Sequence, residues 1–349
     1  MSKRNEFIDI MRIVCCIMVI CIHTSPLIKI SPILNYGLCH IISRIAVPFF
    51  FITSGYFFAI KLYSRDEKRT LNIKRYIGNQ IKIYLITSLI YSFFNIFIFE
   101  TVHFDSVKNI LDFLRTYIFT GYYHLWYLNA SIISLILINI IYSRFKEKSI
   151  VIFSLVLYLI GTLLNTYSFV LQQTRFELIS YIYYLVFVTS RNGLFFGFPM
   201  MIMGIMVYKY KLYGNLKSSV LGLIISFFIY IMETIFLKLI GDPVFRDMYI
   251  FLIPVTYFLF LTLINLKDTF PNKLYIFKNF ISYFSNLTLV IYCVHILVIN
   301  FTRSIFNTSG GLIELLIVFI FSTIIAIFVT EFKSKFVVLK NRIDIRIGS

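Results

Sequence analysis

The residues best suited to chemistry lie on the first hydrophobic segment, where Arg12 and His23 are separated by ten residues. Ionisable side chains inside a membrane are costly and usually face a protein interior or a water-filled cavity. Eleven helical steps make about three turns and about 16 Å, so the two side chains would share one helix face near opposite ends. A guanidinium group can hold an anion, and a neutral imidazole can act as a general base or briefly carry an acyl group. The spacing therefore predicts a site that extends along one membrane-spanning helix.

Both residues also have a structural interpretation. His23 precedes a Thr-Ser-Pro sequence that predicts the end of the helix, and a histidine there can simply hydrogen-bond to a neighbouring span. We give the two interpretations of His23 equal weight. Arg12 follows Asp9 by one turn on the same side, and a long arginine near a helix end can place its charge at the membrane surface. Considered alone, Arg12 is better explained as such an interfacial residue.

The composition of the whole chain is that of a membrane protein. Of its 349 residues 59% are hydrophobic and 14% are charged, and the mean hydropathy is +0.85. A soluble domain is about half apolar and about a quarter charged. The apolar runs extend from end to end, which predicts an all-α polytopic protein without an independent soluble domain. The pattern predicts ten membrane spans, at residues 10–26, 39–60, 80–99, 124–143, 150–170, 194–209, 218–237, 248–266, 284–302 and 312–330.

The net charge of +17 is explained by topology. If the N-terminus is cytoplasmic, most lysines and arginines fall in the segments that would also be cytoplasmic, as the positive-inside rule requires. The bias predicts that both termini are cytoplasmic, with a transmembrane domain over 1–332 and a basic cytoplasmic tail over 333–349. We therefore expect the lipid bilayer, and no nucleic acid, as the partner of this charge. The first span is too long for a signal-peptide core, so we expect it to be retained.

The sequence offers little support for metal, redox or nucleotide motifs. All five cysteines lie in apolar segments without CxxC spacing, so we interpret them as small hydrophobic residues and expect no metal site. The chain contains no Walker loop, no GxGxxG and no internal repeat. These observations argue against an ATP-driven pump and a dinucleotide-dependent enzyme.

Span two holds a second candidate, Arg44, four residues before Pro48. Proline removes a backbone donor, and the following Ser54-Gly55 pair permits close helix packing. A buried arginine beside a broken helix can bind an anionic group in a cavity. An arginine bonded to the carbonyls freed by a kink explains the pattern equally well.

Further polar residues lie at the predicted outer ends of the spans. Trp126 and His124 open span four and are suited to an acceptor sugar, although an aromatic belt at the membrane surface explains Trp126 better. Arg191 and Asn192 are suited to a carboxylate or hydroxyls, or else form a helix N-terminal turn. Glu233 in span seven either is ion-paired structurally or orients His23, with equal weight.

Several of these segments together resemble the membrane-bound acyltransferase-3 family, whose members have ten spans and acylate sugars, lipids and cell-envelope polymers. The resemblance rests on Arg-x10-His in span one, a PFFFITSGY segment in span two, HLWYL from His124 and SNLTLVIYCVH ending at His295. It covers nearly the whole chain, and the paired motifs are fairly specific. One departure is Ile296, where the family often has proline.

A narrower resemblance links the chain to the membrane domain of vancomycin-resistance-type serine/alanine racemases. It rests on RNGLFFGFP at 191–199, on Glu233 and on DMYIFLIP at 247–254. In those proteins a racemase domain follows the membrane part, which has been proposed to handle serine. Because this chain ends after its last predicted span, we expect no racemase domain and no lysine for pyridoxal phosphate.

The resemblance implies a division of roles along span one. His23 would be the catalytic residue near the external face, and Arg12 would help to hold an acyl-CoA donor that arrives from the cytoplasm. Arg69 and Arg75 are suited to the phosphates of CoA, although topology explains most of the charge in their loop better. The remaining candidates for donor or acceptor contacts are Arg44, His124, Trp126, Arg191, Asn192, Glu233 and His295.

The leading hypothesis is a bacterial plasma-membrane acyltransferase that O-acetylates an envelope glycan or amino sugar, with acetyl-CoA as co-substrate and no bound cofactor. The alternative is a transporter-like module for serine or a similar small metabolite. An acyltransferase needs a base such as His23, whereas a transporter tolerates its replacement more readily. A non-catalytic scaffold leaves the ionisable residues inside the membrane unexplained.

Overall fold

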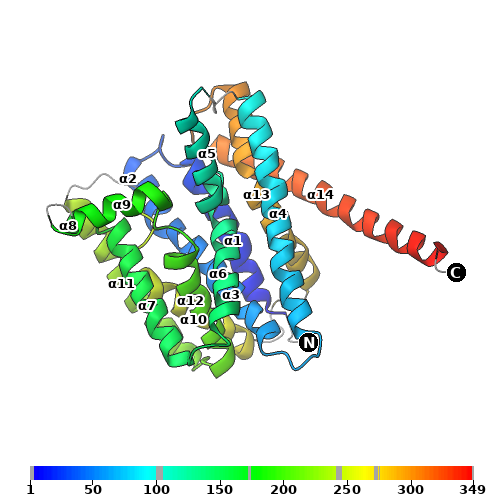
Figure 1. The fold of residues 1–349 in the computed structure, drawn as a ribbon, viewed down its shortest axis with the longest axis horizontal. Coiled ribbons are helices and arrows are strands. Elements are labelled where there is room, and N and C mark those ends of the chain that lie inside the picture. The colour runs from blue at the N-terminus through cyan, green and yellow to red at the C-terminus, as the bar shows by residue number, and fades with distance from the viewer. Residues whose placement is uncertain are drawn as a thin grey trace. The chain divides into compact units, whose positions relative to one another are not determined.

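A computed structural model of the chain describes residues 4–99, 105–171, 174–240, 246–270, 274 and 276–347, and only the backbone beyond residue 335. Over these ranges the protein is all-helical, and no strand occurs among them (Figure 1). The chain forms two compact units. Unit 1 contains residues 1–46 and 272–349, and unit 2 contains residues 47–271.

The prediction of ten spans is confirmed for the described ranges. Ten helical segments there are long and apolar enough to cross a membrane, and each overlaps one predicted span: Glu6–Thr24, Pro32–Leu62, Arg69–Phe97, Val107–Ile141, Glu147–Asn165, Gly193–Tyr210, Leu216–Leu239, Leu252–Thr269, Lys278–Phe306 and Leu312–Lys335.

Unit 1 is built around helix α1 (Glu6–Thr24), which packs against α13 (Lys278–Phe306) and α14 (Leu312–Ile347). Cys15, Val19 and Ile20 on α1 are buried, as are Leu287 and Ile291 on α13. These apolar side chains hold α1 against helices that lie more than 250 residues away in the sequence. The backbone of α14 remains helical to Ile347, so the predicted tail 333–349 continues this helix over its described part.

The second span begins with a short helix α2 (Pro32–Tyr36), a π-helical turn η1 (Gly37–Ile42) and a 3-10 turn η2 (Ser43–Ile45). Regular helix α3 (Ala46–Leu62) starts only after them. Pro48 has no N–H to donate to the carbonyl of Arg44, four residues before it. The irregular helix that this proline predicts therefore lies immediately before it.

Unit 2 contains most of the remaining spans. Its helix α10 packs against α6 and α7, α4 packs against α6, and α11 packs against α12. The bounds of its elements are α4 (Arg69–Phe97), α5 (Val107–Phe119), η3 (Tyr123–Leu125), α6 (Trp126–Ile141), α7 (Glu147–Asn165), α8 (Ser168–Leu171), α9 (Glu177–Phe187), η4 (Gly193–Gly197), α10 (Phe198–Tyr210), α11 (Leu216–Leu239) and α12 (Leu252–Thr269).

Two glycines bring α3 and α10 into close contact. A Cβ atom on Gly55 would overlap the backbone of Met201, and one on Gly204 would overlap the carbonyl of Ile52. Small residues of this kind let helix backbones approach closely in membranes. The close packing permitted by these glycines is thus used within the chain.

One carboxylate in unit 2 contacts residues at the ends of three other helices. Glu147, the first residue of α7, pairs with Lys209 and accepts hydrogen bonds from the hydroxyls of Tyr210 (2.5 Å), Tyr63 and Tyr142 (3.4 Å each). These partners lie at the C-terminal ends of α3, α6 and α10. Since burial and the Glu147 charge raise the pKa values of Tyr63 and Tyr142, both phenols stay protonated and donate.

Candidate functional site

Helix α1 carries both residues of the first predicted pair. The Asn5 side chain caps its N-terminus by accepting from the backbone amides of Phe7 (3.0 Å) and Ile8 (3.3 Å). At the other end, Ser25 adopts a left-handed conformation (φ 44°) and ends the helix directly after Thr24, as the Thr-Ser-Pro sequence predicts. Arg12 and His23 therefore lie on one uninterrupted helix.

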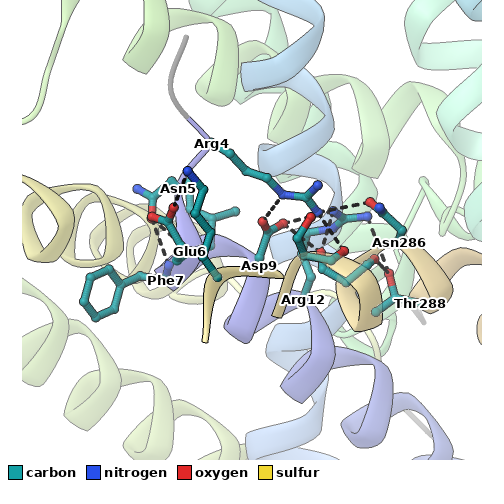
Figure 2. A network of polar contacts seen from close by, with 12 residues as sticks. Arg4, Asn5, Glu6, Phe7, Asp9, Arg12, Asn286 and Thr288 are labelled. Carbon is teal, nitrogen blue, oxygen red and sulfur yellow. Dashed lines mark hydrogen bonds and ion pairs between the residues drawn. The ribbon is translucent and has the colours of Figure 1, made fainter. Parts of the chain in front are cut away.

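Arg12 belongs to a polar network that joins α1 to α13 (Figure 2). Its guanidinium group donates to Asp9 (3.3 Å), Ser285 (2.8 Å) and Thr288 (3.5 Å). The Ser285 hydroxyl in turn donates to Asp9 (2.7 Å). The side chain of Asp9 is only 4% exposed, and its pairing with arginine offsets the cost of burying its charge.

A second arginine shares this carboxylate. Arg4 pairs with Asp9 and also donates to the carbonyl of Ser282 (3.1 Å) and the side chain of Asn286 (3.0 Å). Two guanidinium groups on one carboxylate leave a local excess of positive charge, and both side chains stay partly exposed, Arg4 at 34% and Arg12 at 26%. This arrangement is chemically suited to an anionic group such as a phosphate.

His23 lies beside a second histidine at the other end of α1. The ring centroids of His23 and His295 are 5.4 Å apart, with the ring planes tilted by 42°. His295 is fully buried on α13, and its Nδ1 lies 2.7 Å from the carbonyl oxygen of Tyr292. A carbonyl only accepts, so Nδ1 carries the proton, and in the neutral ring Nε2 is the basic nitrogen. The predicted residues His23 and His295 are thus brought together from opposite ends of the sequence.

Arg44 also belongs to unit 1. It lies in turn η2, which packs against α1, and its Nη2 is 3.2 Å from Nδ1 of His40. Unit 1 therefore gathers Arg12, His23, Arg44 and His295 around a single helix.

Unit 2 brings together another group of the predicted residues. The guanidinium group of Arg191 lies 4.6 Å from the ring centroid of Trp126 and donates to Asp247 at 2.6 Å. Trp126 is 8% exposed and also stacks on Phe196 (5.8 Å between ring centroids). The tryptophan is consequently a packed side chain, and its contact with a sugar stays a prediction.

Asn192 and His124 have structural partners in the same unit. Asn192 caps turn η4: its side-chain oxygen accepts from the amides of Leu194 (3.0 Å) and Phe195 (3.1 Å). This is the helix N-terminal turn that was one interpretation of its position. His124 is buried, with its ring centroid 4.9 Å from that of Tyr91.

Glu233 hydrogen-bonds to a non-helical segment that was predicted from the sequence to be part of a helix. Span eight was predicted to start at residue 248, but α12 starts at Leu252, and the preceding residues are non-helical. Glu233 accepts from the backbone amides of Ile250 (2.7 Å) and Phe251 (3.0 Å) and from the hydroxyl of Tyr167 (2.6 Å). Burial and this carboxylate raise the pKa of Tyr167, which therefore remains a donor. Backbone amides outside a helix need such partners, and Glu233 supplies them here, while its orientation of His23 stays a prediction.

Arg69 and Arg75 lie in the first two turns of α4, and both are exposed. Their exposure fits either of the two interpretations of this basic loop.

Sequence reasoning missed two residues beside His23. Arg303 on α13 donates to the backbone carbonyl of His23 (2.8 Å) and pairs with Glu314 in the first turn of α14. The available signal was an acidic residue at the start of an otherwise apolar predicted span, since such a residue is costly unless it is paired.

Comparison with known proteins identifies the family of this chain. Residues 5–331 match the acyltransferase domain of the acyltransferase-3 family. The chain belongs to this family. Among its relatives, an amino-acid racemase of Enterococcus faecalis is 33% identical and aligns with 98% of this chain and 48% of its own length. A serine/alanine racemase of Enterococcus gallinarum is 29% identical over 74% of this chain and 37% of its own.

This member of the acyltransferase-3 family thus spans about half the length of the curated relatives it matches. No solved structure matches the chain. The predicted relation to both the acyltransferase-3 family and the vancomycin-resistance-type racemases is confirmed.

Proposed function

We propose that the protein transfers an acetyl group from cytoplasmic acetyl-CoA to a hydroxyl or amine of an envelope glycan or amino sugar outside the cell. Membership of the acyltransferase-3 family supports a membrane acyltransferase. The observation that carries the finer proposal is the layout of α1, which has an arginine-rich polar network at one end and a histidine pair at the other.

In this proposal the neutral imidazole of His23 takes the proton from the acceptor hydroxyl or amine as that group attacks the thioester carbonyl. The carbon–sulfur bond breaks, and CoA leaves as a thiolate that is then protonated. Arg12 and Arg4 hold the anionic part of the donor by charge-assisted hydrogen bonds. The excess of lysine and arginine in the predicted cytoplasmic segments supports a cytoplasmic location for the Arg12 end of α1, on the side from which the donor would arrive.

The names of the relatives favour a second candidate. An amino-acid racemase and a serine/alanine racemase share their matched regions with this chain. A membrane module that moves serine or a similar metabolite would fit that association without acyl transfer.

One experiment separates the two candidates. The purified protein is reconstituted in liposomes and supplied, in separate assays, with acetyl-CoA labelled in the acetyl group and with labelled serine. CoA release, either by hydrolysis or with transfer of label to an added hexosamine or glycan, supports the acyltransferase. Uptake of serine without CoA turnover contradicts it and supports the transporter.

A further inference from the structure

The C-terminal end of α1 is held by one group from α13 and one from the loop between α13 and α14. The last four carbonyl groups of a helix have no partner within the helix and need one from elsewhere. Here Arg303 on α13 donates to the carbonyl of His23 at 2.8 Å, and the amide of Gly311 donates to the carbonyl of Thr24 at 3.0 Å. The carbonyl groups of the candidate catalytic histidine and of the residue after it thus each have a donor from outside α1.

A single buried carboxylate binds both Arg303 and the loop that contains Gly311. Glu314 is completely buried and accepts from Nε (3.0 Å) and Nη2 (2.8 Å) of Arg303 through one oxygen. Its other oxygen accepts from the amide of Gly310 at 2.9 Å. A negative charge in the first turn of α14 is also favoured by the helix dipole. Glu314 thus fixes the arginine and the glycine loop at once.

The glycine loop fits against α1 without spare room. Gly310 has φ +104°, a conformation that side chains rarely adopt, and a Cβ atom there would lie 2.8 Å from the carbonyl oxygen of Thr24. Gly311 has φ +118°. A larger residue at Gly310 would displace the loop or the end of α1.

We propose that Arg303 and Glu314, with the Gly310-Gly311 loop, form a clamp that positions His23 for acyl transfer. The clamp sets the place of the His23 backbone, while packing against His295 sets the orientation of its ring. Arg303 and Glu314 are positioning residues, because their side chains act on the backbone around His23 and not on the reacting atoms. The inference rests on the proposed function, since it assigns these residues a part in the same reaction.

The clamp is tested with Arg303→Met, Arg303→Lys and Glu314→Gln in the full-length protein. Small displacements of a catalytic group cost large factors in rate, so Arg303→Met and Glu314→Gln should lower kcat at least about tenfold. The KM for acetyl-CoA should stay unchanged, because the arginine network at the other end of α1 is intact. Arg303→Lys keeps a cationic donor and should recover part of kcat. The double variant should lose little more than Arg303→Met alone, because residues that act as one unit are not additive.

The matched control is Asp112→Asn, which removes the charge of an exposed carboxylate paired with Arg115 at 3.0 Å. It should leave both kcat and KM unchanged.

Hydrogen exchange at the amides of Gly310 and Gly311 reports on the clamp independently of activity, and Arg303→Met should accelerate it. Wild-type kcat in Arg303→Met, or an equal loss in Asp112→Asn, overturns the role in catalysis. If wild-type protein transfers no acyl group, the proposed function fails, while unchanged exchange in Arg303→Met overturns the clamp itself.

Discussion

At the scale of single residues, the site depends on how ionisable groups are neutralised inside a membrane. Asp9 is buried and pairs with two arginines, and Glu314 is buried and pairs with one. Breaking a buried pair by removing one partner is strongly destabilising because a buried charge is left uncompensated. The Asp9 network holds two guanidinium groups for one buried carboxylate, whereas the Glu314 pair is locally neutral.

The Arg12 network yields a prediction about donor binding. Arg12→Met removes the guanidinium group and should raise the KM for acetyl-CoA about tenfold or more, equivalent to about 1.4 kcal/mol. Arg12→Lys should recover only part of the affinity, since lysine lacks the planar set of donors. The measurement is the initial rate of CoA release against donor concentration. An unchanged donor KM in Arg12→Met would remove this residue from the donor site.

At the scale of helices, the sequence predicted the spans well because long apolar runs report membrane insertion directly. Shorter elements escaped prediction: α5 and α9 lie in segments between the predicted spans. The non-helical segment before Leu252 was missed because its backbone amides are satisfied by Glu233 and Asn165, which are distant in sequence. The placement of Arg12 and His23 on one helix face could be predicted from their spacing in the sequence. The clamp on His23 could not, because it depends on contacts between helices.

The contact between α3 and α10 gives a prediction about stability. Gly55→Ala places a Cβ atom into the backbone of Met201 and should cost about 1–3 kcal/mol, as overpacking does. Gly78→Ala on α4 is the matched control, because a Cβ atom there has nothing within 4 Å. It should be neutral or should stabilise the helix by up to about 1 kcal/mol. Thermal unfolding in detergent measures both, and equal melting temperatures for the two variants would contradict the packing.

At the scale of the whole molecule, the proposed reaction requires that the two ends of α1 face opposite sides of the membrane. The charge bias predicts that the loop before α4 is cytoplasmic and that the loop before α5 is external. The five native cysteines are all buried, so a maleimide should react mainly with cysteines that are introduced at exposed positions.

Cysteine labelling in intact cells tests this topology. Glu67 and Asp105 are both exposed, one in each loop. A membrane-impermeant maleimide should label Asp105→Cys in intact cells and label Glu67→Cys only after the membrane is opened. The reverse pattern would place Arg12 on the outer side and would contradict the direction of transfer.

The central claim is that His23 supports acyl transfer, and the direct measurement is acetyl transfer by His23→Ala protein in liposomes. Removing a positioned general base typically costs about 10²- to 10⁴-fold, so transfer should fall to background. Membrane insertion and the elution volume in size-exclusion chromatography should match those of the wild-type protein, because His23 lies at a helix end. Transfer by folded His23→Ala protein at the wild-type rate would contradict the proposed function of this histidine.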